Sequence, residues 1–232
     1  MNAFWESRDA EKRVLRECPH YLILYKPPRL HTAPLRAPDD GSLLGWAAQK
    51  YPDILAVNGH RAGEGGLLYR LDYETRGLVL IARTQKLFDA LKGGFTKQYD
   101  AFSAGVENAP GGFPPFAGAI AARAGALQEF AIRSAFRAYG PGRRAVRPVP
   151  GGAPRTYVSE GVSVKTESGV MFRICIHRAF RHQIRCHLAW AGYPLLNDRL
   201  YGGRETGQGL ALRASSITFR DGAELVNYAL EP

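Results

Sequence analysis

The chain has 232 residues, which is enough for one large domain or two small ones with a hydrophobic core. Its 31 lysine and arginine residues exceed its 21 aspartate and glutamate residues, so the formal net charge is +10. This charge indicates a polyanionic partner, RNA or DNA ahead of an anionic membrane, although a merely basic soluble protein has the same balance. A hydrophobic fraction of 45% excludes general disorder.

Cysteine usage and the amino terminus indicate the cellular setting. The scattered residues Cys18, Cys175 and Cys186 form no CxxC pair, so we expect neither a metal cluster nor a disulfide framework. Residues 1–8 have no apolar signal core, and no apolar run approaches the length of a membrane span. We therefore expect a cytoplasmic protein without a membrane partner.

The first half of the chain alternates short strands with short helices. Residues 21–25 have the composition of a strand that Pro27 ends, and Ser42 is a suitable N-cap for a helix over residues 42–48. The apolar run 78–82 is typical of a buried strand, residues 84–91 have the spacing of an amphipathic helix, and residues 99–106 have a strand pattern.

The second half is richer in strands and contains a basic segment. Residues 139–155 combine glycine and proline with arginines, including Arg143 and Arg144, and predict an exposed, mobile loop. Strands are expected at 162–166 and 170–176, a helix at 182–190, and one or two further strands between 211 and 229. Because strands outnumber helices without a regular βαβ rhythm, we predict an α+β fold with a mixed, largely antiparallel sheet.

An acidic residue stands at the entry to the buried strand expected at 78–82. Asp72 follows Arg70 by two residues, and Thr75 and Gly77 precede the apolar run. A carboxylate held at the mouth of a rigid strand beside a cation is a candidate catalytic group. The commoner alternative for such a pair is a surface ion pair or a turn cap.

The helix expected at 182–190 carries a second group of polar residues. Helical spacing places Arg185 off the apolar side and beside His182, so Arg185 is either a solvated residue or a cation that faces Asp72 and keeps it ionised. His177, His182 and His187 are five residues apart, which turns them away from a common face, and we predict no metal site. The GxSxG, P-loop and GxGxxG motifs are absent, which removes the commonest hydrolase, kinase and dehydrogenase types.

Four segments, in order along the chain, resemble the RluA family of pseudouridine synthases. The family motif HRLDxxTSGLLLxA corresponds to residues 69–82, and the motif GRTHQIRxHLxxxGxPxxxDxLYG corresponds to residues 179–202. A KPxG-type segment corresponds to residues 26–29, and a Lys-x-Tyr strand start to residues 97–99. The resemblance implies the pseudouridine synthase catalytic fold, in which helices and loops flank a central sheet and an active-site cleft runs across it.

The resemblance also implies roles for individual residues. Asp72 corresponds to the catalytic aspartate, Arg185 to its ion-pair partner, and Tyr99 to the tyrosine that stacks on the target base. Arg70 corresponds to the residue that fills the stack when the uridine leaves it. The second motif and the basic segment supply the remaining expected RNA contacts, which are His182, Gln183, Arg181, Arg143 and Arg144.

The implied reaction isomerises specific uridines in rRNA or tRNA to pseudouridine. Nothing enters or leaves the nucleotide, so the resemblance implies no cofactor and no metal. The chain departs from the family at Tyr69, which replaces histidine, at Arg76, which replaces serine, and at residues 179–181, where Ala-Phe-Arg replaces Gly-Arg-Thr. These departures indicate a divergent subgroup and leave open a catalytically inactive RNA-binding relative of the same fold.

We expect an N-terminal extension over residues 1–20 and a single catalytic domain over residues 21–232, acting as a monomer. The extension is too short for the N-terminal S4 module of some longer relatives, so substrate choice would rest on the catalytic domain or on a partner. We further hypothesise that the basic loop at about 139–155 closes over the RNA.

Overall fold

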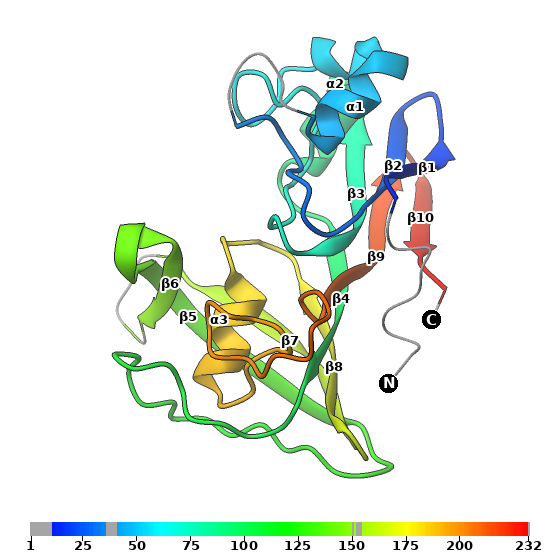
Figure 1. The fold of residues 1–232 in the computed structure, drawn as a ribbon. Coiled ribbons are helices and arrows are strands. Elements are labelled where there is room, and N and C mark those ends of the chain that lie inside the picture. Colours follow the sequence, from blue (N-terminus) through cyan, green and yellow to red (C-terminus); the bar gives the residue numbers. More distant parts are fainter. Residues whose placement is uncertain (1–10, 36–40, 150, 152–154, 232) are drawn as a thin grey trace. The chain divides into compact units, whose positions relative to one another are not determined.

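The computed structural model describes residues 11–35, 41–149, 151 and 155–231. They form two compact units (Figure 1). We call residues 11–97 and 213–231 the terminal unit, because it is made from both ends of the chain, and residues 98–212 the central unit. The boundaries between the units fall within strands β4 (Thr96–Ser103) and β9 (Leu212–Asp221).

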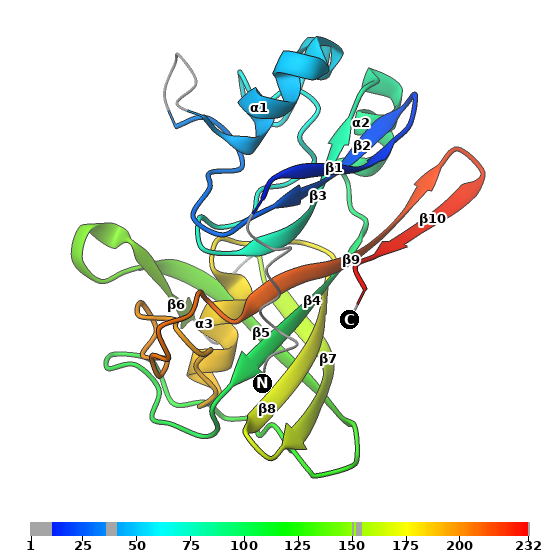
Figure 2. The same ribbon diagram turned by 45° about the vertical axis from the view of Figure 1, so that its right-hand side comes forward.

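The terminal unit contains a mixed sheet in the order β1-β2-β3-β9, with β10 also paired to β9. Its other strands are β1 (Arg13–Glu17), β2 (Tyr21–Lys26), β3 (Arg76–Ala82) and β10 (Glu224–Ala229). The pairing of β3 with β9 is parallel, whereas β1–β2, β2–β3 and β9–β10 are antiparallel. Figure 2 shows β9 and β10 as a long hairpin. Every residue of β2 and β3 is buried, in agreement with their continuous apolar composition.

Short helices complete the terminal unit. They are α1 (Leu43–Lys50), the 3-10 helix η3 (Pro52–Ala56) and α2 (Gln85–Leu91). Ser42 Oγ accepts a hydrogen bond from the amide of Gly45 at 3.1 Å, which confirms the predicted N-cap of α1, and Thr84 caps α2 in the same way. None of the helices in the described parts of the chain is long and apolar enough to span a membrane.

The central unit contains a sheet in the order β4-β8-β7-β5-β6. Its strands after β4 are β5 (Gln128–Tyr139), β6 (Ala145–Val149), β7 (Tyr157–Thr166) and β8 (Gly169–Ile176). The pairs β5–β6, β5–β7 and β7–β8 are antiparallel. Helix α3 (Gln183–Trp190) lies beside β5 and β6 in both figures, and the 3-10 helix η4 (Pro141–Arg143) forms the turn of the β5–β6 hairpin. The predicted α+β fold with a mixed, largely antiparallel sheet is confirmed.

Three elements differ from the sequence-based expectations. The expected N-terminal extension contains β1, which pairs with β2. The segment expected as a mobile loop at 139–155 is instead ordered over residues 141–149, where it forms η4 and β6, although residues 150 and 152–154 lie outside the described residues. Left-handed backbone at Gly140 and Gly142, with φ of 75° and 61°, makes the turn that returns the chain along β5. The division into an extension and one catalytic domain stays a prediction.

The third difference is the environment of α3. An amphipathic helix with Arg185 outside the apolar side was expected, but all eight residues of α3 are buried. The polar side chains of this helix therefore need partners inside the central unit, and these partners define much of its chemistry.

Candidate active site

Asp72 lies half-buried in the turn before β3, and the peptide that precedes it is held by a threonine. Thr32 Oγ1 donates to the carbonyl of Leu71 at 2.9 Å and accepts from the amide of Leu71 at 3.1 Å. Both residues are buried, with 3% of Thr32 and 7% of Leu71 exposed. The Thr75 amide also donates to the Asp72 carbonyl at 3.0 Å, which closes the turn. The backbone at Asp72 is therefore fixed independently of what its carboxylate contacts.

The peptide that follows Asp72 is held by a buried lysine. Lys26 Nζ donates to the carbonyl oxygens of Pro27 at 2.9 Å, Leu30 at 2.8 Å and Tyr73 at 3.2 Å. These three acceptors match the three N–H groups of a charged ammonium. Burial lowers the pKa of Lys26 to about 7, while the nearby carboxylates of Asp72 and Glu74 oppose this shift. The lysine of the KPxG-type segment thus ties its own loop to the turn that carries Asp72.

The residues that flank Asp72 in the first motif have separate roles. Arg70 is exposed, and its Nη1 atom lies 3.3 Å from a carboxylate oxygen of Glu64. Tyr69, which stands where the RluA family motif has histidine, is buried and donates its hydroxyl to the carbonyl of Leu78 at 2.5 Å. Tyr69 therefore secures the motif to β3.

Gly77, at the start of β3, lies against the backbone of β9. Its φ is +118°, and a Cβ atom there would meet the carbonyl oxygen of Ala214 at 2.2 Å. Only glycine fits this close parallel pairing, which explains the glycine in the first motif.

Arg185, on α3, is buried and forms a bidentate ion pair. Its Nε and Nη2 atoms each donate to a carboxylate oxygen of Asp198 at 2.7 Å, and its guanidinium lies 5.4 Å from the centre of the Tyr201 ring. A two-point contact of this kind fixes the plane of the guanidinium. The solvated alternative for Arg185 is wrong, because only 7% of the residue is exposed. The predicted pairing of Arg185 with Asp72 stays a prediction.

The first residues of α3 anchor the helix. His182 precedes it in the left-handed conformation, with φ of 55°, and its Nδ1 atom lies 3.3 Å from the hydroxyl of Tyr201. Gln183 is 2% exposed; its Nε2 donates to the carbonyl of Val158 at 2.8 Å and its Oε1 accepts from the amide of Phe180 at 2.9 Å. These contacts favour a structural role for Gln183 over the RNA contact expected from the motif.

His187 is buried between two serines. Its Nδ1 lies 2.9 Å from Ser159 Oγ, and its Nε2 lies 2.9 Å from Ser134 Oγ. Burial lowers the pKa of His187 to about 3, so the imidazole is neutral, with one nitrogen donating and the other accepting. Within the described ranges, no three His, Cys, Asp or Glu side chains lie close enough together to hold a metal ion.

The remaining predicted residues also belong to the central unit. Tyr99 lies on β4 and is 5% exposed. Arg181 is exposed and its Nη2 donates to the carbonyls of Arg143 at 2.8 Å and Ala145 at 3.2 Å. Arg143 and Arg144 are exposed at the turn of the β5–β6 hairpin. Arg181 therefore connects the segment before α3 to the turn of the β5–β6 hairpin.

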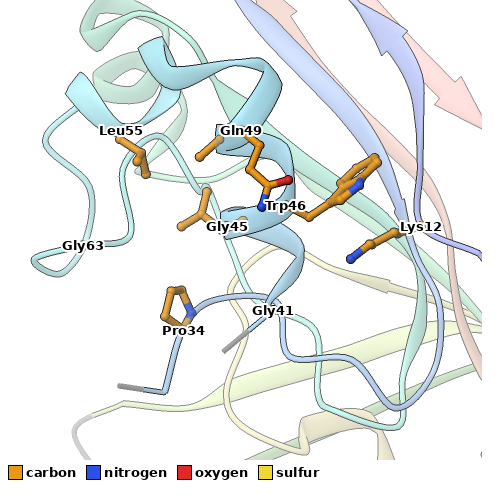
Figure 3. Close-up of a pocket in the computed structure, with 10 residues that line it drawn as sticks. Lys12, Pro34, Gly41, Gly45, Trp46, Gln49, Leu55 and Gly63 are labelled. Carbon is orange, nitrogen blue, oxygen red and sulfur yellow. The ribbon is translucent and has the colours of Figure 1, made fainter. Parts of the chain in front are cut away.

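A hollow of about 490 Å³ occurs in the terminal unit (Figure 3). Trp46, on α1, and Lys12 line it, and Lys12 is the one charged residue in its described lining. None of the predicted site residues contributes to this lining. The hollow is thus distinct from the turn that carries Asp72.

A sequence profile described as RNA pseudouridylate synthase matches residues 20–190. The chain belongs to the RNA pseudouridylate synthase family. The RluA-type resemblance of the two long motifs is thereby confirmed, since several curated relatives of the same kind also match.

Among these relatives, a ribosomal large subunit pseudouridine synthase D from Pseudomonas aeruginosa is 30% identical over 206 residues. The alignment covers 86% of this chain and 56% of the relative. The corresponding protein of Vibrio parahaemolyticus is 28% identical, covering 86% of this chain and 55% of the relative. The chain therefore spans little more than half the length of these curated relatives.

Solved structures support the same fold. Human RNA Pseudouridylate Synthase Domain Containing 1 aligns with a TM-score of 0.63 at 15% identity, covering 97% of this chain and 84% of that one. Human RNA Pseudouridylate Synthase Domain Containing 4 aligns with a TM-score of 0.56 at 18% identity, covering 94% and 87%. At these identities the likeness shows the pseudouridylate synthase fold.

Proposed function

We propose that the chain is an RNA pseudouridine synthase that isomerises specific uridines of ribosomal RNA. The observation that carries this proposal is the turn at Asp72, which lies in the first family motif. Thr32 holds the residue before Asp72, and Lys26 holds the residue after it. A catalytic carboxylate must be held in one place, because small displacements of a reacting group lower the rate strongly. The names of the curated relatives support ribosomal RNA ahead of tRNA.

In the proposed reaction the uracil base leaves the ribose at nitrogen, turns, and rejoins at carbon. The ionised carboxylate of Asp72 acts on the sugar, as a nucleophile or by assisting elimination to a glycal. Tyr99, or a water that it orients, accepts the proton that leaves the ring carbon after the new bond forms. The nucleotide gains and loses no atoms or electrons in this isomerisation, so we propose no cofactor.

We propose Arg185 as the cation that keeps Asp72 ionised. Its bidentate contact with Asp198 supports this role, because a guanidinium that is fixed on one edge loses less freedom when it binds a second carboxylate. The target uridine is flipped out of its stack at a cost of a few kcal/mol. Arg70 is proposed to fill the vacated place, and His182, Arg181, Arg143 and Arg144 to contact the RNA.

Pseudouridine mapping tests this proposal. The purified chain is incubated with unmodified transcripts of ribosomal RNA and, separately, of tRNA, and new pseudouridines are located by chemical mapping. We expect modification of the ribosomal transcript and its loss in Asp72→Asn, whereas Asp89→Asn, an exposed carboxylate on α2 that pairs with Lys92, keeps it. An active Asp72→Asn variant would show that the catalytic assignment is wrong.

The inactive alternative predicts RNA binding without any new pseudouridine in either transcript. The proposal also includes action in the cytoplasm and as a monomer, in a single catalytic domain. Light scattering of the purified chain checks the monomer, and a mass of twice 25.5 kDa would contradict it.

A further inference from the structure

We propose that Arg133, Arg137 and Arg147 form a binding surface for the phosphates of an RNA backbone on one face of the β5–β6 hairpin. This inference rests on the proposed function only in taking RNA as the partner. It assigns a role to three arginines that lie outside both family motifs.

Strand register places these arginines on a common face. Arg137 lies directly opposite Arg147 in the antiparallel β5–β6 pair, so their side chains point to the same side. Arg133 lies four residues earlier on β5 and therefore shares that side. Arg133 and Arg137 are exposed, and Arg147 is half-buried. Like charges directly opposite each other oppose pairing of the strands, so an anion between them would relieve a repulsion that is built into the hairpin.

The charge of this face is not neutralised by neighbouring side chains. In the parts of the chain that the structure describes, no carboxylate lies within ion-pair distance of Arg133, Arg137 or Arg147. The Arg147 guanidinium contacts neutral groups: Nη1 donates to the carbonyl of Gly112 at 2.6 Å, and the group lies 6.0 Å from the centre of the Tyr139 ring. Ala135 and Val149 lie between Arg133 and the Arg137–Arg147 pair and are too small to shield the guanidinium groups. Glu160 lies on the same face opposite Ala131, and its carboxylate lies 3.8 Å from His177.

The hairpin is also held rigidly. The Val146 amide donates to the hydroxyl of Tyr201 at 2.9 Å, and Cys186 Sγ lies 3.4 Å from the carbonyl of Val146. Ala145 and Val146 pack in a buried cluster with Cys186 and Tyr201, and Arg181 binds the turn. The backbone positions of the arginines are therefore fixed before a ligand arrives, which reduces the entropy lost on binding.

The spacing favours a polymer over a single phosphate ion. Opposite residues in an antiparallel pair are about 5 Å apart, so Arg137 and Arg147 can share one phosphate. Arg133 is about 13 Å from Arg137 along the strand and needs another phosphate. Guanidinium groups bind phosphate with two parallel hydrogen bonds. Tyr139, which β5 places on the same face, donates its hydroxyl to the carbonyl of Gly111 and packs against Phe113, so it is not available to insert into a membrane or a protein.

A salt titration tests this surface separately from catalysis. A G·C-only RNA duplex of about 16 base pairs contains no uridine, and its affinity is measured by fluorescence anisotropy between about 50 and 200 mM salt. The double variant Arg137→Gln/Arg147→Gln should bind more weakly. Its slope of log affinity against log salt should be less steep by about 0.7 to 0.9, which corresponds to loss of the one phosphate contact that Arg137 and Arg147 share. Arg220→Gln, on the exposed part of β9, is the matched control and should keep the parent slope.

Thermal unfolding distinguishes this role from a structural one. Arg137→Gln alone removes the repulsion and leaves the contacts of Arg147 with Gly112 and Tyr139 in place, so its melting temperature should equal or exceed that of the parent protein. An unchanged salt slope in the double variant, or a melting temperature of Arg137→Gln below that of the parent protein, would overturn the inference. The parent protein could form no pseudouridine while the double variant still shows a weaker salt dependence of RNA affinity. That result would contradict the proposed reaction and support the binding surface.

Discussion

Replacing Thr32 with valine tests whether the turn at Asp72 is held as described. Valine has nearly the shape of threonine but neither donates nor accepts, so both the amide and the carbonyl of Leu71 lose a buried partner. Each buried group left unpaired costs about 1–3 kcal/mol, and removing the threonine hydroxyl from the interior offsets part of this. We expect the free energy of unfolding to fall by about 2–4 kcal/mol.

The reference variant is Thr32→Ser, which keeps both hydrogen bonds and loses one methyl group, at a cost of about 1 kcal/mol. Denaturant unfolding measures both variants. Thr166→Val, which removes a single half-buried contact with Gly169 in the central unit, controls for threonine replacement in general.

The same variant should impair the proposed reaction. A shift of about 1 Å in the carboxylate of Asp72 would lower the single-turnover rate by up to about 100-fold, whereas RNA affinity should be unchanged because Thr32 is buried. If Thr32→Val is as stable and as active as Thr32→Ser, the turn is not held by this threonine, and the argument for a fixed Asp72 loses its first support.

Two further predictions concern stability. The unfolded chain protonates His187 near pH 6.5, whereas the folded chain does so only near pH 3, so the free energy of unfolding should fall as the pH drops through this window, by up to about 5 kcal/mol. Denaturant unfolding at several pH values should show that His187→Asn lacks this component and that the exposed His177→Asn retains it. Gly77→Ala should cost about 3 kcal/mol or more, because the new Cβ meets the Ala214 carbonyl, while Gly93→Ala, with open space around it, should melt close to the parent temperature.

Local sequence patterns located the elements around Asp72 but not what holds them. The apolar run of β3 and the motif residues are contiguous, so their composition alone indicated a buried strand with a carboxylate at its start. Thr32 and Leu71 are 39 residues apart, and a hydrogen bond between them leaves no periodic signal. Asp198 lies in the second motif, but spacing alone gives no sign that it binds Arg185.

The second strand of the β5–β6 hairpin was predicted as a loop, because residues 139–155 are rich in glycine, proline and arginine and show no clear alternation of apolar and polar residues. Gly140 and Gly142 belong to the turn, yet the prolines and arginines around them also suggested an irregular segment. The strand character of residues 145–149 becomes clear only from the partners of Val146 in the central unit. For α3, helical spacing predicted an exposed polar side, and the burial of Arg185 depends on a carboxylate supplied from outside the helix.

The parallel pairing of β3 with β9 has a consequence for how the protein is made. It joins Arg76 to Arg213, so the terminal unit is built from segments that leave the ribosome far apart in time. Until residues 213–229 emerge, the apolar β3 has an open edge, which is a template for pairing with other chains. The central unit is continuous in sequence and can fold in the meantime. Chains that stop near residue 212 should therefore aggregate through β3 even though their central unit is complete.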